Sequence, residues 1–132
     1  MFAFSAIYVP LLELNATILS GRMCANPMIN IILNGCNGKM GRVVTRIASE
    51  SNDCKIVAGF DISDEIKNEY PVYSNPYDFN SSADVIIDFS HPDSLKKLLP
   101  FAISRKLPLV IATTGLSHQQ VLMLHETANH VP

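Results

Sequence analysis

The sequence predicts an α/β fold in which helices cover both faces of a doubly wound parallel sheet. From residue 28 onward, short apolar runs rich in Ile and Val alternate with segments whose apolar residues recur at helical spacing. The apolar runs lack the polar alternation of a half-exposed strand, which indicates strands buried on both faces. Right-handed crossovers between such strands give a doubly wound sheet.

Four strands are expected, each bounded by polar residues or glycine. They are MINIILN at 28–34, KIVAGF at 55–60, ADVIIDFS at 83–90, and LPLVIATTG, which includes a turn, at 107–115. Between the second and third strands, residues 61–82 are polar and contain Pro71 and Pro76. We therefore expect this stretch to be mostly loop, with room for one short strand and a turn.

Three helices are expected. One spans 91–106, where Pro92 suits the first turn and Pro100 should kink or limit the helix. Another spans 117–130, with Ser117 as its N-cap. The helix nearest the N-terminus spans 39–49, and its apolar residues at helical spacing are Met40, Val43, Val44, Ile47 and Ala48. Met40 is expected to belong to the core rather than to contact a ligand through its side chain.

The composition narrows the class of protein. The chain has 132 residues, 48% of them hydrophobic, which suits one domain with its own core. A net charge of −2 excludes a strongly basic nucleic-acid footprint and a polybasic membrane patch. Three cysteines without a CxxC pair favour a reduced, cytoplasmic setting. The four histidines lack metal-ligand spacing, so no metal site is expected.

Residues 1–27 differ from the rest of the chain. Pro10 and Glu13 interrupt their apolar character, and no basic residue precedes Arg22, so neither a membrane span nor a secretory signal is expected. We interpret them as an atypical extension that is poorly ordered or loosely docked. An alternative is that Met28 is the original start of the domain, because the first strand begins at once there.

Three glycines, Gly35, Gly38 and Gly41, follow the first strand directly. In a doubly wound sheet, ligands bind at the carboxyl ends of the strands. Glycines there allow a tight turn, close approach of a pyrophosphate to the backbone, and close packing of helix on strand, while the helix N-terminus attracts phosphate. The G-x-x-G-x-x-G spacing departs from the usual G-x-G-x-x-G, so a plain tight turn stays an alternative.

An acidic residue closes the second strand. Asp61 lies 20 residues after Gly41, where a carboxylate that binds the adenosine ribose hydroxyls is expected. The alternative is a cap or solvated loop residue. Ile62 follows it in place of an arginine that would bind a 2′-phosphate, which favours NADH over NADPH, although Lys39 or Lys67 could supply the charge.

The third and fourth strands end at DFSHP and ATTG, and these segments could lie along the nicotinamide half of a dinucleotide. Asp84 and Asp88 bracket the third strand, and roles at ladder ends or as caps are favoured over acid–base chemistry. Cys36 lies in the glycine turn. A helix N-terminus could make it a reactive thiol, but a small residue that fills space is the favoured interpretation.

Taken together, GCNGKMGR, ADVIIDFSHPDSL and PLVIATTGL, in this order and spacing, resemble the N-terminal domain of the dihydrodipicolinate reductases. These are the 4-hydroxy-tetrahydrodipicolinate reductases of the diaminopimelate route to lysine. The resemblance covers residues 28–132 and implies an incomplete Rossmann-like domain that binds NADH or NADPH. Thr114 is also implied to lie near the substrate, a small dicarboxylate heterocycle. The implied cofactor contacts are Gly35, Cys36, Asn37, Gly38, Lys39, Met40, Asp61, Ala112, Thr113 and Thr114.

Two departures from the family pattern matter. Ala112 stands where the family usually has glycine, and its methyl group could crowd the nicotinamide. The family's H-H-x-x-K-x-D-A-P-S-G stretch, which belongs to a C-terminal substrate and tetramerisation domain, does not occur. We therefore expect no catalytic residue in this chain, no turnover by it alone, and an exposed edge strand and apolar face. The full-length enzyme is implied to be a homotetramer.

Two rival functions stay open. One is a Rossmann module that senses a nucleotide without catalysing a reaction. The other is a different oxidoreductase with the same fold, since fold alone does not define activity. The DFSHP and ATTG loops argue against this second rival.

Overall fold

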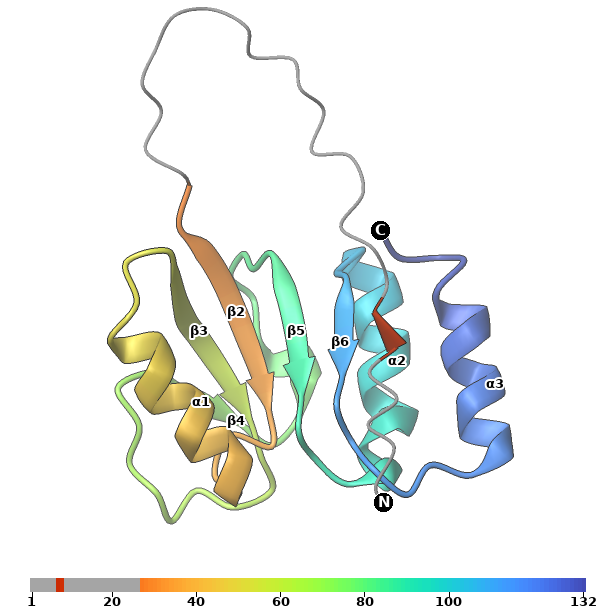
Figure 1. Cartoon of the computed structure of the whole chain (residues 1–132), viewed down its shortest axis with the longest axis horizontal. Helices are drawn as coiled ribbons and strands as arrows, with labels where there is room; N and C mark the ends of the chain where they lie inside the picture. The colour runs from red at the N-terminus through yellow and green to blue at the C-terminus, as the bar shows by residue number, and fades with distance from the viewer. Residues whose placement is uncertain (1–6, 9–26) are drawn as a thin grey trace, which may run out of the picture.

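The computed structural model describes residues 7–8 and 27–132. It contains a six-stranded sheet in the order β1-β6-β5-β2-β3-β4, in which β2 pairs in parallel with both β3 and β5 (Figure 1). Only the two-residue β1 runs antiparallel, beside β6. The predicted α/β fold with a parallel sheet is confirmed. The strands are β1 Ile7–Tyr8, β2 Ile29–Asn34, β3 Cys54–Phe60, β4 Val72–Tyr73, β5 Val85–Asp88 and β6 Leu109–Ile111.

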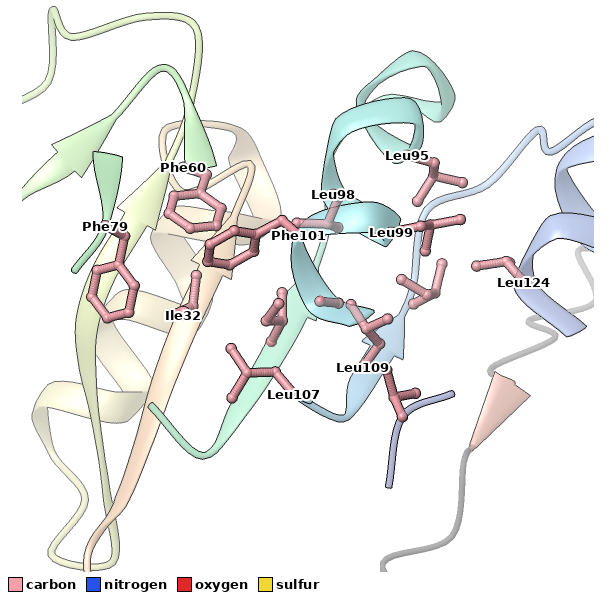
Figure 2. Packing of buried hydrophobic residues seen from close by; sticks show 14 of the residues in the cluster. Ile32, Phe60, Phe79, Leu95, Leu98, Leu99, Phe101, Leu107, Leu109 and Leu124 are labelled. Atoms are coloured by element: carbon pink, nitrogen blue, oxygen red, sulfur yellow. The ribbon is translucent and has the colours of Figure 1, made fainter. Parts of the chain in front are cut away.

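Helices flank both faces of the sheet. Figures 1 and 2 place α1 on the opposite face to α2, with α3 packed beside α2. All parallel strands end at the same edge, where the loops that follow β2, β3, β5 and β6 meet. The helices are α1 Lys39–Ser49, α2 Leu95–Arg105 and α3 His118–Thr127, and the short 3₁₀ helices are η1 Pro76–Asp78 and η2 Pro92–Ser94.

The main core lies between the sheet and the helices α2 and α3 (Figure 2). Ile32 from β2 and Ile86 from β5 are fully buried there. Phe60 contacts Phe79 and Phe101 edge to face, with ring centroids 6.4 and 5.5 Å apart. Burial of these side chains is the main favourable contribution to folding, because each removes a large apolar area from water.

Most expected elements are present, with small shifts in their bounds. α1 has the predicted bounds, and the stretch 61–82 contains only β4 and η1. Ser117 caps α3 in a capping box: its Oγ accepts from Gln120 N at 3.2 Å, and its N donates to Gln120 Oε1 at 2.9 Å. The strand predicted at 107–115 is shorter, since only Leu109–Ile111 pairs.

A kink or a limit was predicted at Pro100, which lies inside α2 and does not end it, so the limit is wrong. Proline removes one backbone hydrogen bond from the helix interior. Three neighbours of Pro100 on the same helix, Leu98, Leu99 and Phe101, are almost fully buried. Their burial in the core offsets the lost hydrogen bond, so the helix continues to Arg105.

The side of α1 that is buried differs from the side that carries most of its large apolar residues. Met40 is 51% exposed, so the core role predicted for it is wrong, and Val43 and Ile47 are 36% and 61% exposed. The helix is buried instead at Gly41 and Ala48. Gly41 lets the helix approach the turn after β2, because a Cβ there would collide with the Gly35 carbonyl, and this close approach fixes the rotation of the helix.

The N-terminal segment contributes β1. Ile7 pairs with Ile111 and Tyr8 with Val110, so these two residues cover the edge of β6. The rest of the segment 1–26, and with it the expectation of a poorly ordered tail, lies outside the described residues. Within residues 7–8 and 27–132, every helix is too short or too polar to cross a bilayer.

A matched pair of leucine truncations tests the assignment of the core. Leu98→Ala should lower the free energy of unfolding by about 2–5 kcal/mol, because Leu98 is only 1% exposed and its removal leaves a cavity. Leu122→Ala makes the same change on α3 where the side chain is 50% exposed, and should cost about 0.5 kcal/mol or less. Urea unfolding followed by circular dichroism measures both, and equal losses would contradict this core.

Candidate nucleotide-binding site

The turn between β2 and α1 requires glycine at two positions. Gly35 has a φ of +77°, and a Cβ there would lie 2.7 Å from the Phe89 carbonyl oxygen. A Cβ on Gly41 would collide with the Gly35 carbonyl and lie 2.6 Å from that of Cys36. The two glycines therefore press α1 onto the end of β2, and β2 onto the loop after β5.

Gly38 is a glycine for a different reason. Its φ is −71°, and an added Cβ would meet only the Gly35 carbonyl oxygen, at 3.4 Å. It is the N-cap of α1, and no side chain caps the helix there. The first N–H groups of a helix have no partner within it and carry a partial positive charge. An exposed, side-chain-free helix start of this kind fits a phosphate group.

Asp61 follows β3 and lies beside the glycine turn. Its Oδ2 accepts a hydrogen bond from Asn37 N at 2.9 Å, and its Oδ1 accepts one from Ser63 N at 3.0 Å. The carboxylate thus caps its own loop, which was one of the two roles predicted for Asp61. It also lies against the glycine turn, where the predicted ribose-binding role requires it to be. Ile62, the next residue, is 96% exposed.

Asn37 joins the glycine turn to the loop after β3. Its Nδ2 donates to the Ser63 carbonyl at 2.5 Å, and its Oδ1 accepts from Asn68 Nδ2 at 2.8 Å. Asn37 therefore uses its side chain within the protein, although the family resemblance implied a contact with cofactor. No local sequence pattern predicts these hydrogen bonds, because the partners of Asn37 lie 26 and 31 residues away in the sequence.

Cys36 fills space beneath the turn. Its side chain is fully buried against Gly59, where any Cβ would lie 2.5 Å from Sγ. Burial, together with the nearby Asp61 carboxylate, raises the pKa of the thiol from 9.0 to about 11. The thiol is fully buried and its pKa is raised rather than lowered, which favours the space-filling interpretation over a reactive thiol. Beside it, Tyr70 shares a 2.7 Å hydrogen bond with Thr45, and burial raises the Tyr70 pKa.

The aspartates that bracket β5 have different environments. Asp84 is exposed, and its Oδ2 accepts from the Asn30 backbone N at 2.7 Å, as expected for a ladder end. Asp88 is fully buried at the other end of the strand. Its Oδ1 accepts from Asn34 Nδ2 at 2.8 Å, and from Ser90 N and Oγ at 3.1 and 2.5 Å. Asp88 is therefore the centre of a network, beyond the cap role expected for it.

The loop after β6 joins the same network. Thr113 is 9% exposed, and its hydroxyl donates to Asp88 Oδ2 at 2.7 Å. Ala112 N donates to the Asp88 carbonyl at 2.9 Å. Thr114 is exposed, and Gly115 has a φ of +76°. Of the two threonines expected at the nicotinamide, only Thr114 turns its side chain outward.

The structure thus brings the predicted loops to one edge of the sheet. Gly35 lies against the backbone of Phe89 and Ser90, and the Ser90 carbonyl lies 3.1 Å from the Thr113 hydroxyl. Lys39 and Met40 are exposed at the start of α1. Across the described ranges, no three His, Cys, Asp or Glu side chains gather in a way that could hold a metal ion.

A doubly wound sheet with a glycine turn, an uncapped helix start and an acidic residue after the second parallel strand defines a Rossmann-like domain. The family model "Dihydrodipicolinate reductase, N-terminus" matches residues 29–132. The chain belongs to the dihydrodipicolinate reductase family, and the matched residues correspond to the family's N-terminal domain.

Individual relatives support the same family assignment. The chain is 43% identical to 4-hydroxy-tetrahydrodipicolinate reductase of Clostridium tetani over 105 residues, which are 80% of this chain and 41% of that protein. It is 42% identical to the reductase of the same name from Caldanaerobacter subterraneus, over the same shares. The chain therefore spans about 41% of the length of these relatives.

Solved structures share the fold. A dipicolinate-bound dihydrodipicolinate reductase from Paenisporosarcina sp. TG-14 superposes with a TM-score of 0.65 at 22% identity, over 76% of this chain and 43% of that one. A myo-inositol 2-dehydrogenase from Lactobacillus plantarum gives 0.64 at 18% identity, over 77% of this chain and 33% of that one.

A glycine-to-alanine series separates the roles of the three glycines. Gly35→Ala and Gly41→Ala should each lower the free energy of unfolding by about 1–3 kcal/mol, because a methyl group meets backbone atoms. Gly38→Ala is the matched control and should change it by less than about 1 kcal/mol. Denaturant unfolding measures all three, and a Gly38→Ala loss as large as the others would contradict this geometry.

The raised pKa of Cys36 predicts a loss of stability at high pH. The unfolded chain releases the thiol proton near 9.0, whereas the folded chain holds it to about 11. The unfolded state is then favoured progressively as the pH rises between these values. Cys36→Ala should therefore show a smaller fall in unfolding free energy between about pH 8 and about pH 10.5 than the wild type. Urea titrations at a series of pH values measure this, and parallel curves would refute it.

Proposed function

We propose that this chain is the nicotinamide dinucleotide-binding domain of a 4-hydroxy-tetrahydrodipicolinate reductase. The observation that carries the proposal is the meeting of three loops at one edge of the sheet: the glycine turn with Asp61 beside it, the loop after β5 and the loop after β6. Membership of the family supports the assignment to this reductase.

The residues present fit such a cofactor. The N–H groups at the start of α1, from Gly38 onward, would hold the pyrophosphate, because no side chain occupies the cap position. Asp61 would accept hydrogen bonds from the adenosine ribose, since its two observed donors leave acceptor positions free on both oxygens. The backbone of 112–114 would lie along the nicotinamide, with the exposed Thr114 side chain near the substrate.

The bound nicotinamide would supply the hydride that reduces a cyclic, imine-type dicarboxylate substrate. The residues of this chain would bind and orient the cofactor and keep the turn beneath it closed to water through the buried Cys36. The groups that seat the substrate carboxylates and donate a proton would come from parts of the enzyme with no counterpart in these residues. On this proposal the chain alone shows no turnover, and the homotetramer and the cytoplasmic setting stay predictions for the whole enzyme.

The site favours NADH over NADPH. A 2′-phosphate on the adenosine ribose would approach the Asp61 carboxylate and be repelled by it. The exposed residue that follows is Ile62, which offers no positive charge. Lys39 and Lys67 are exposed on the surrounding segments and could weaken this preference.

Calorimetric titration of the chain with NADH and NADPH tests the proposal. NADH should bind saturably and more tightly than NADPH, and Asp61→Ala should weaken NADH binding about tenfold or more, through loss of hydrogen bonds to a charged acceptor. Asp64→Ala removes the same charge from an exposed position of the same loop and should leave binding within about twofold. Equal losses in the two variants, or no binding by the wild type, would overturn the proposal.

A further inference from the structure

We propose that the buried network around Asp88 positions the nicotinamide half of the cofactor, by fixing the loop of residues 112–115 through the Thr113 hydroxyl. The inference rests on the proposed function and distinguishes residues that position the site from residues that would contact the ligand. Asp88 and Thr113 are positioning residues, because their side chains point into the protein. The neighbouring Thr114 and the loop backbone are the groups that would face the ligand.

The hydrogen bonds of the network converge on the Asp88 carboxylate. Both oxygens of Asp88 are occupied by donors: Asn34 and Ser90 on Oδ1, and Thr113 on Oδ2. Ser94 Oγ lies 2.5 Å from Ser90 Oγ, so its hydroxyl can donate to Ser90 while Ser90 donates to the carboxylate. These bonds tie the ends of β2, β5 and β6 to one carboxylate.

The loop of residues 112–115 depends on this carboxylate. It has no regular secondary structure, and Gly115 in the left-handed region has no neighbouring atom within 4 Å of an added Cβ. Its hydrogen bonds to β5 and the residues just after it come from Ala112 N and the Thr113 hydroxyl. Removing the Thr113 hydroxyl would leave the loop held to β5 by Ala112 N alone, and would leave a buried carboxylate oxygen without that donor.

This arrangement predicts that loss of the Thr113 hydroxyl affects the binding of one half of the dinucleotide and not of the other. The adenosine and pyrophosphate half would contact the glycine turn and Asp61, neither of which hydrogen-bonds to Thr113. The nicotinamide half would contact the loop that Thr113 fixes. ADP-ribose carries the first half and lacks the nicotinamide ring, so it serves as the probe for a change that is confined to the loop.

The experiment compares NADH and ADP-ribose binding by calorimetry in three variants of the 132-residue chain. Thr113→Val should raise the Kd for NADH about tenfold and change that for ADP-ribose less than about twofold. Thr113→Ser keeps the hydroxyl and should bind both like the wild type. Thr127→Val is the matched control, because it removes a buried hydroxyl on α3 that bonds only to Met123 O, at 2.8 Å, and should change neither. A merely structural role would weaken both ligands equally, which would overturn the inference.

Hydrogen exchange gives a second test without ligand. The amides of 112–115 should exchange faster in Thr113→Val than in Thr113→Ser, while those of the glycine turn stay unchanged. Equal exchange in both variants would overturn the inference. If Thr113→Val does not fold, Ser90→Ala serves in its place, because it keeps the backbone donor to Asp88. It should also weaken NADH binding more than ADP-ribose binding, but by a smaller factor. Failure of the wild type to bind either ligand would overturn the proposed function and the positioning role with it, and the exchange data would still decide whether Thr113 holds the loop.

Discussion

A single buried carboxylate holds together the edge of the sheet on which the site depends. Asp88 is fully buried and accepts hydrogen bonds from residues on β2, just after β5 and just after β6. A buried charge without such donors is costly, so the three strand ends must keep their relative positions for the carboxylate to stay satisfied. The loops that follow these strands then leave the sheet from fixed points.

The second constraint is the close approach of α1. Gly35 and Gly41 remove the side chains that would separate the helix from β2 and from the Phe89 backbone. The same approach buries Cys36, raises its pKa and sets the uncapped helix start next to Asp61. A short distance between backbones thus produces the exposed helix start, the buried thiol with its raised pKa and the placement of the acidic residue.

Much of the fold and part of the candidate site were predictable from the sequence, because strand and helix periods and the glycine spacing are local signals. The bounds of α1, the Ser117 cap and the position of Asp61 at the turn followed from them. The rotation of α1 did not, because Gly41, which carries no apolar side chain, makes the contact that decides it. Nor did the inward side chain of Thr113 or the bonds of Asn37 to the loop after β3. These depend on partners 25 or more residues away.

The central claim is that the three loops form one dinucleotide site, and amide chemical shifts test it most directly. Titrating the ¹⁵N-labelled chain with NADH should shift the amides of 35–41, 61–63 and 112–115 together, along one saturation curve. Shifts confined to the glycine turn, or centred on the surface between α2 and α3, would contradict a site built from all three loops.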